Sequence, residues 1–198
     1  MGFVERYLGE CNEILGRIDH GEVERLATHL AYLRDHGGRL FVLGVGGSAA
    51  TASHAVNDFR KLCGIEAYAA TDNVAELTAR TNDDGWPSVF REWLKGSRLA
   101  ARDAVLVLSV GGGDPNTGIS SCLVEAVDYA VQKGARVFGI LGRQGGYTAT
   151  RADVSVMIPP VVPERVTPHT EGIASVVLHL LVSHPSLQRH ATKWESIA

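Results

Sequence analysis

Cysteine is scarce in this sequence, and the few copies are far apart. Cys11, Cys63 and Cys122 are the only three cysteines, and no two of them have CxxC spacing. Their separation argues against a zinc finger, a redox-active pair and a disulfide framework, and it favours a reducing compartment such as the cytoplasm.

Long hydrophobic runs and charge of one sign are also missing. The most apolar window, VVLHLLV at 176–182, is too short to cross a bilayer, and the start MGFVERYLGE lacks the apolar core of a signal peptide. Arg6 stands where a myristoylation motif after Gly2 would need Ser or Thr. The 19 Lys and Arg residues are scattered and the formal net charge is −3. We therefore expect a small ligand, and neither nucleic acid nor a membrane as a partner.

What the sequence does contain is an alternation of apolar strands and helices. Its 198 residues, 45% of them hydrophobic, suffice for one sizeable core. Strands are predicted at 40–45, 66–70, 104–110, 136–142 and 154–159, and helices at 3–18, 21–36, 48–62, 74–80, 86–95, 115–133, 147–152 and 166–184. Strands that are apolar on both faces are typical of a parallel sheet covered by helices on both sides. We predict a single α/β domain over 1–198, with a five-stranded parallel sheet as the middle of three layers.

Three glycine-rich segments follow the predicted strands: GVGGSA at 44–49, VGGGDPN at 110–116 and GRQGGY at 142–147. In an open parallel sheet, ligands bind beyond the carboxyl ends of the strands, near the point where the strand order reverses. Exposed N–H groups in such loops attract anions. Any one loop is explained equally well as turn chemistry, but three together favour a phosphate-bearing ligand.

The common nucleotide-binding motifs are not matched. GxxxxGK[ST] is absent, and the segment that begins like GxGxxG has Ala49 in place of the third glycine. Asp72 and Asp114 are better interpreted as helix N-caps, the latter followed by Pro115 at the first helical position, and His169 as a helix-entry cap. A dinucleotide-dependent dehydrogenase is therefore the less favoured alternative.

The segment GVGGSAATASHAVNDF at 44–59 resembles the GNGGSxxDAxHFxxEL segment of phosphoheptose isomerases, which are members of the sugar isomerase (SIS) domain family. The likeness extends over nearly the whole chain, through ARTND at 79–83 and GRQGG at 142–146 to a closing helix with Glu171 and His179. It implies interconversion of sedoheptulose 7-phosphate and D-glycero-D-manno-heptose 7-phosphate through an enediol. It also implies a zinc-dependent homotetramer whose N-terminal helices, within 1–37, pack against other subunits, while 38–198 form an α/β sandwich.

The resemblance assigns roles to individual residues. The catalytic pair is Asp58 and His179, and the zinc ligands are His54, Asp58, Glu171 and His179. The substrate-binding residues are Gly46, Gly47, Ser48, Asn82, Asp83, Ser109, Gly111, Gly112 and Gly113. The i, i+4 spacing lets His54 and Asp58 share a ligand, although from spacing alone a simple surface pair is equally consistent. Residues 171 and 179 would be about 12 Å apart on a regular helix, so either both lean inward or Glu171 precedes the helix.

Several positions depart from the family pattern. Val45 replaces an asparagine, Thr51 replaces an aspartate, and SVGGGD at 109–114 replaces the serine-rich STSGNS loop. A phosphate would therefore be held mainly by Ser48 and by the N–H groups of 111–113. Two alternatives remain open, an isomerase of a different phosphosugar and a SIS-domain regulator without turnover; the proton-transfer residues favour an enzyme.

Overall fold

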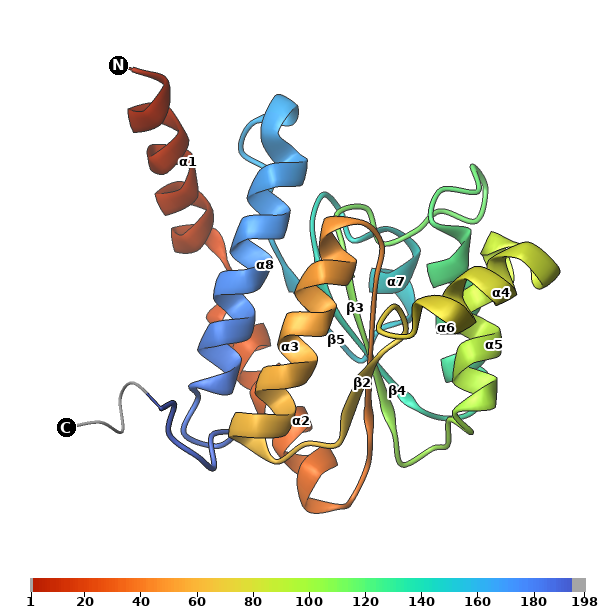
Figure 1. Ribbon diagram of the computed structural model, residues 1–198. Coiled ribbons are helices and arrows are strands. Elements are labelled where there is room, and N and C mark those ends of the chain that lie inside the picture. Colours follow the sequence, from red (N-terminus) through yellow and green to blue (C-terminus); the bar gives the residue numbers. More distant parts are fainter. Residues whose placement is uncertain (1, 194–198) are drawn as a thin grey trace.

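The computed structural model describes residues 2–193, and its centre is a five-stranded parallel sheet (Figure 1). The strands are β1 (Leu40–Gly44), β2 (Ala67–Ala69), β3 (Ala104–Ser109), β4 (Arg136–Leu141) and β5 (Val154–Met157). They lie in the order β2-β1-β3-β4-β5, and every neighbouring pair is parallel. The predicted α/β fold is confirmed, because the apolar runs that suggested strands are the segments buried in the middle layer.

Helices cover both faces of the sheet. They are α1 (Phe3–Arg17), α2 (His20–Asp35), α3 (Gly47–Cys63), α4 (Val74–Asp84), α5 (Val89–Gly96), α6 (Ser121–Gln132), α7 (Gly146–Arg151) and α8 (Val166–Val182), with 3-10 turns at Trp86–Ser88 and Pro163–Arg165. Leu40 and Val42 of β1 pack in one core with α2, α3 and α8, whereas Phe41 and Leu43 pack in a second core with α5 and α6. This alternation follows from the period of two along a strand and produces the three layers.

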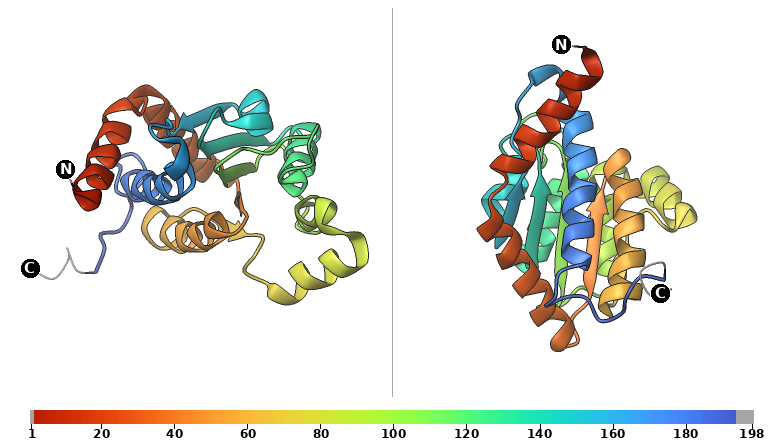
Figure 2. Two further views of the ribbon diagram at one scale, coloured as in Figure 1. Left: turned by 90° about the horizontal axis from the view of Figure 1, so that it is seen from above. Right: turned by 90° about the vertical axis from the view of Figure 1, so that its left-hand side faces the viewer.

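The N-terminal helix α1 lies across α8 at the outside of one helical layer (Figure 2). The Glu10 carboxylate accepts bonds from Arg165 Nη2 and His169 Nε2, each at 2.7 Å, and the Tyr7 ring lies 4.4 Å from the His169 ring. His169 is only 4% exposed and lies inside α8, which begins at Val166. The interpretation of His169 as a helix-entry cap is therefore wrong; it fastens α8 to α1.

The predicted helix at 115–133 begins later than expected. The Asp114 carboxylate accepts hydrogen bonds from the Asn116 N–H at 2.8 Å and the Thr117 hydroxyl at 2.9 Å, and Asp114 forms an isolated antiparallel bridge with Ile119. A short aspartate side chain that bonds to the backbone two residues on closes a turn and competes with the helix. Asp114 is therefore not a helix N-cap, and α6 starts only at Ser121.

Asp72 was also expected to cap a helix, and its neighbour does so instead. The Asn73 side chain accepts from the Glu76 N–H at 3.2 Å at the start of α4, whereas Asp72 accepts from the Ser53 hydroxyl of α3.

No helix among residues 2–193 combines the length and the apolarity that crossing a membrane requires.

Candidate active site

A cavity of about 520 Å³ lies where the strand order reverses. The chain runs from β1 outward to β2 and then crosses to β3 on the other side of β1, so the carboxyl ends of β1 and β3 flank the switch point. Four of the nine predicted substrate-binding residues line this cavity: Ser48, Ser109, Gly111 and Gly113. The cavity is thus at the place in the fold where open parallel sheets bind ligands.

The turn between β1 and α3 brings α3 against α8. Gly46 has φ 62°, a backbone conformation that glycine adopts without strain, and α3 begins at the next residue. A Cβ on Gly47 would lie 2.6 Å from the carboxylate oxygens of Glu171, so the missing side chain leaves the space that this carboxylate occupies. Gly46 and Gly47 therefore place Ser48 and Glu171 together at one wall of the cavity.

Gly112, in the second glycine-rich loop, is required by the packing of the loop itself. Its N–H is donated to Ser109 Oγ at 2.9 Å, and its carbonyl accepts from the Thr148 N–H at 2.9 Å and the Thr148 hydroxyl at 2.7 Å. A Cβ on Gly112 would overlap the carbonyl oxygen of Gly145, and its φ is 70°. The Gly112 N–H is therefore already donated within the loop, and a glycine is required here for the packing of the two loops.

Asn82 and Asp83 are not brought to the cavity. Both lie in the last turn of α4, where the Asn82 side-chain amide donates to Asp83 Oδ1 at 2.8 Å. Both side chains are exposed, and neither is among the residues lining the switch-point cavity.

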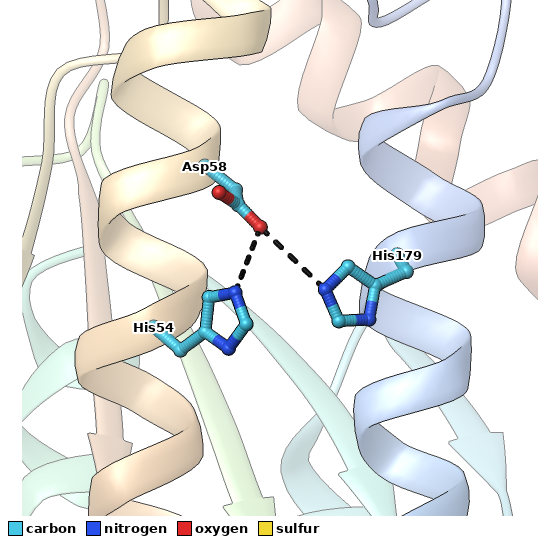
Figure 3. Close-up of side chains that lie close together, drawn as sticks. All are labelled: His54, Asp58 and His179. Carbon is cyan, nitrogen blue, oxygen red and sulfur yellow. Dashed lines mark ion pairs between the residues drawn. The ribbon is translucent and has the colours of Figure 1, made fainter. Parts of the chain in front are cut away.

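His54 and Asp58 of α3 face His179 of α8 (Figure 3). His54 Nε2 lies 3.2 Å from Asp58 Oδ2, and His179 Nε2 lies 3.8 Å from the same oxygen. The two imidazole rings are 5.0 Å apart and meet edge to face. Asp58 is only 16% exposed, against 54% for each histidine, so the carboxylate lies at the base of an open cluster.

The spacing of this cluster fits a tetrahedral metal ion. One ligand atom from each of His54, Asp58 and His179 lies within 4.8 Å of the other two. Zinc bonds of about 2.0–2.1 Å in a tetrahedron put neighbouring ligand atoms about 3.3 Å apart, close to the separations of 3.2 and 3.8 Å found here. Two imidazoles and a carboxylate suit zinc, and a set of three protein ligands leaves a fourth position open.

Glu171 is not part of the three-residue cluster. Helix α8 is continuous from Val166 to Val182, so Glu171 does not precede it and lies about 12 Å along the axis from His179. Its carboxylate faces Gly47 at the cavity instead. The structure thus brings together three of the four predicted metal ligands and places the fourth in the predicted substrate site.

The two buried cysteines provide no alternative nucleophile. All three are free, and Cys63 and Cys122 are buried. Burial raises the pKa of each of these two thiols to about 11, so both remain protonated near neutral pH.

Sequence reasoning missed several residues that line the cavity, among them Arg143 and Thr167. Arg143 lies in the third glycine-rich segment, GRQGGY at 142–147, and a basic residue in such a loop is the sequence signal that points to it. Thr167 carries no local signal, because it reaches the cavity only through the packing of α8.

Comparison with known proteins identifies the family. The SIS domain model matches residues 6–142, well over half of the chain. The chain belongs to the SIS domain family. Among SIS relatives, a phosphoheptose isomerase from Syntrophotalea carbinolica is 29% identical over 187 residues, which cover 89% of each chain. One from Chlorobium phaeobacteroides is 32% identical over 160 residues, covering 77% of this chain and 68% of the relative. The lincomycin biosynthesis protein LmbN of Streptomyces lincolnensis is 33% identical over 165 residues, covering 78% of this chain and 56% of LmbN.

Solved SIS structures confirm the architecture. The phosphoheptose isomerase GmhA of Neisseria gonorrhoeae superposes with a TM-score of 0.78 at 24% identity, covering 91% of this chain and 96% of GmhA. The phosphoheptose isomerase of Francisella tularensis also gives 0.78, at 20% identity, covering 91% and 92%. The resemblance to phosphoheptose isomerases that the sequence suggested is confirmed by these comparisons.

Proposed function

We propose that this SIS domain protein is an aldose–ketose isomerase of a phosphorylated sugar, with sedoheptulose 7-phosphate and D-glycero-D-manno-heptose 7-phosphate as its substrate pair. The observation that carries the proposal is the cluster of His54, Asp58 and His179, which lies farther along the two helices whose first turns wall the switch-point cavity. A binding protein needs the cavity alone, whereas an isomerase also needs proton-transfer groups beside the sugar. Relatives named phosphoheptose isomerase support the choice of sugar.

The length of a heptose phosphate fits this arrangement. Ser48 and His54 are six residues apart on α3, which corresponds to a rise of about 9 Å. The eight bonds from the first carbon of an extended heptose 7-phosphate to its phosphorus span about 9–10 Å, taking about 3.3–3.6 Å for three bonds of an extended chain. With the phosphate in the cavity, the proposed sugar is therefore long enough for its carbonyl end to extend along α3 toward the cluster.

Isomerisation moves one proton between adjacent carbons. His179 would take the proton from the carbon next to the carbonyl; the electron pair left behind forms the carbon–carbon double bond of an enediol, while the carbonyl oxygen gains a proton. Asp58 would return a proton to the neighbouring carbon as the second hydroxyl becomes the new carbonyl. Its carboxylate lies within reach of both imidazoles, so one cluster can serve both steps.

A zinc ion is the proposed cofactor, with His54, Asp58 and His179 as its protein ligands. The nitrogen lone pair of His179 cannot bind the ion and take up a proton at once, so His54 and Asp58 would hold the ion while His179 acts as the base. When bound, zinc would polarise the carbonyl oxygen and make the adjacent proton more acidic. Glu171, the fourth ligand that the resemblance implies, would instead contact sugar hydroxyls from its position beside Gly47.

A homotetramer is the proposed assembly. Four large apolar side chains of α1 are exposed, namely Phe3, Val4, Leu8 and Leu15, and Val176 and Leu180 of α8 are exposed as well. Apolar residues gathered on neighbouring helices favour packing against another subunit.

Three free thiols are consistent with the cytoplasm as the proposed compartment.

The deciding experiment is solvent exchange into the sugar. In deuterated water, the protein should incorporate deuterium at C1 or C2 of sedoheptulose 7-phosphate and should form the aldose, whereas other phosphosugars of a panel should react more slowly. Faster exchange with another panel member would identify a different substrate. Tight binding without exchange for the whole panel would favour a regulator, since the NanR protein of Vibrio vulnificus, complexed with ManNAc-6P, shares this fold with a TM-score of 0.63.

A further inference from the structure

We propose that Arg143, in the loop between β4 and α7, is the cationic anchor for the phosphate group of the substrate. The inference rests on the proposed function, because it assigns the phosphate end of the same site. Arg143 lines the switch-point cavity of about 520 Å³ and also an adjoining cavity of about 670 Å³ that shares Gly111, Gly113 and Asp114 with it. It is the only lysine or arginine among the described residues that line either cavity.

The Arg143 side chain is available for a ligand. Two arginines near it in sequence are engaged within the fold: Arg136 pairs with Asp153 at 2.5 Å, and Arg151 pairs with Asp128 at 3.5 Å. Arg143 has no ion pair or hydrogen bond to any side chain in the part of the chain that the structure describes, and it is exposed toward the cavities. An unpaired guanidinium at a cavity wall can bind a phosphate through two parallel hydrogen bonds.

The backbone at Arg143 is held in a conformation that disfavours any side chain. Its φ is 48°, in the left-handed region, where a residue with a Cβ is less stable than glycine. Glycine occupies the two left-handed positions that follow, Gly145 at the end of the loop and Gly146 at the start of α7, with φ of 75° and 50°. A strained residue among glycines, at the edge of two cavities, is typical of a position kept for its side chain.

The two carboxyl groups at the cavity would repel a phosphate, so a bound phosphate needs a cation beside it. Asp114 lines both cavities, and hydrogen bonds from the Asn116 N–H and the Thr117 hydroxyl lower the pKa of its carboxyl, so it stays ionised. Glu171 adds a second carboxyl to the switch-point cavity. A phosphate dianion placed between these groups would be repelled unless a positive charge also faced it. The Gly112 N–H is already donated to Ser109, which leaves the loop fewer donors for the phosphate.

Arg143→Gln is the direct test, with Arg98→Gln as its matched control. Arg98 is also exposed and also left-handed, with φ 54°, but it lines neither cavity. We expect Arg143→Gln to weaken binding of sedoheptulose 7-phosphate at least tenfold by calorimetry, to raise KM and to leave kcat within about threefold. Unphosphorylated sedoheptulose should bind both proteins equally, and Arg143→Lys should retain part of the affinity. Arg98→Gln should behave as the wild type.

A second variant separates the anchor from a structural role. Arg143→Gly removes the side chain and relieves the backbone, so its Tm should equal or exceed that of the wild type while its affinity for the phosphosugar falls as in Arg143→Gln. Unchanged affinity in both variants would overturn the inference, and so would a wild type that binds no phosphosugar of the panel and no inorganic phosphate. Arg143-dependent phosphosugar binding without any turnover would overturn the proposed isomerase while leaving the anchor in place.

Discussion

At the scale of single residues, Asp58 is the group on which the candidate chemistry depends. It is the least exposed member of its cluster, and the same carboxylate oxygen faces both histidines. The spacing of His54 and Asp58 on one helix was visible in the sequence, but a pair on a helix surface contributes only about 0.2–0.5 kcal/mol. Because His179 of α8 lies 3.8 Å from the same carboxylate oxygen, the group is more than a pair on one helix surface.

Asp58→Asn keeps the volume of the side chain and removes its charge. We expect turnover to fall at least about 100-fold, equivalent to about 2.7 kcal/mol of barrier, with a similar fall for His179→Ala. If metal analysis finds zinc in the wild type, both variants should also lose it, because each removes one of three ligands.

Two controls lie outside the cluster. Asp35→Asn alters a carboxylate paired with Arg34 at 2.8 Å, and His184→Ala alters a histidine paired with Glu24 at 3.1 Å. Both should keep near-normal activity, and circular dichroism should show all four variants folded. An Asp58→Asn protein with near-normal kcat would show that this cluster is a solvated pair without a role in the chemistry.

At the scale of elements, the site is made by loops that meet only because glycine allows it. The loop after β3 packs against the start of α7, with the Thr148 and Tyr147 N–H groups bonded to the carbonyls of Gly112 and Gly113 at 2.9 Å. The glycines of these loops that looked alike in sequence therefore have different tasks: some border the cavity, and Gly112 joins two loops.

Gly112→Ala should destabilise the protein by at least about 2 kcal/mol, because the new Cβ overlaps the Gly145 carbonyl in a left-handed backbone. The neighbouring Gly111→Ala is the matched control, since a Cβ there meets nothing within 4 Å, and its free energy of unfolding should change by no more than about 1 kcal/mol. Chemical denaturation of both variants measures the difference. Equal stabilities would show that the two loops are not packed as described.

The attachment of α1 to α8 should depend on pH. Hydrogen bonds from Arg165 and His169 lower the pKa of Glu10 from its usual 4.5 to about 2. A carboxyl whose pKa is lower in the folded state stabilises that state above its unfolded pKa, and the contribution is lost as the carboxyl becomes protonated. The contact should therefore be fully present above about pH 4.5 and weaken as the pH falls toward 2.

Glu10→Gln should loosen α1 already at neutral pH, seen as faster hydrogen exchange of the amides in Phe3–Arg17. Glu13→Gln is the control on the same helix, because within residues 2–193 Glu13 forms its ion pair with exposed Arg17, at 3.1 Å. In the wild type, NMR signals of the Tyr7 ring should shift over the same acidic range. Unchanged exchange in Glu10→Gln would show that apolar packing alone holds α1.

At the scale of the whole molecule, one side carries apolar surface that the single chain does not cover. The exposed apolar surface of α1 is continuous with that of α8. Leu15 of α1 and Val176 and Leu180 of α8 border a hollow of about 300 Å³. Helix α1 itself buries only Ile14, so it contributes little to the core of its own subunit. Such a helix gains most of its stability from packing against something else.

The protein should be a tetramer by light scattering at micromolar concentration. Leu8→Glu and Leu180→Glu, which place charges on the exposed apolar surface, should reduce the assembly to smaller species. Tyr32→Glu, on α2, also alters an exposed residue but lies outside that surface, and it should leave the mass unchanged. A wild type that is monomeric under these conditions would contradict the proposed assembly.

The sequence by itself determined the order of the strands and helices along the chain, the parallel sheet and the family, because these depend on apolar runs of strand length and on a local motif. It failed at Asp114, where a side chain that bonds to its own backbone imitates a helix start, and at His169, whose partner Glu10 is far away in the chain. Only the tertiary structure decided which candidates meet. The packing of α3 against α8 brings His179 close to His54 and Asp58. Because α8 is one continuous helix, Glu171 lies at the cavity and not in that cluster. The loop after β4 places Arg143 at the wall of the same cavity. The reason is physical: a local pattern specifies the element on which a side chain lies, whereas the packing of elements distant in sequence specifies what that side chain faces.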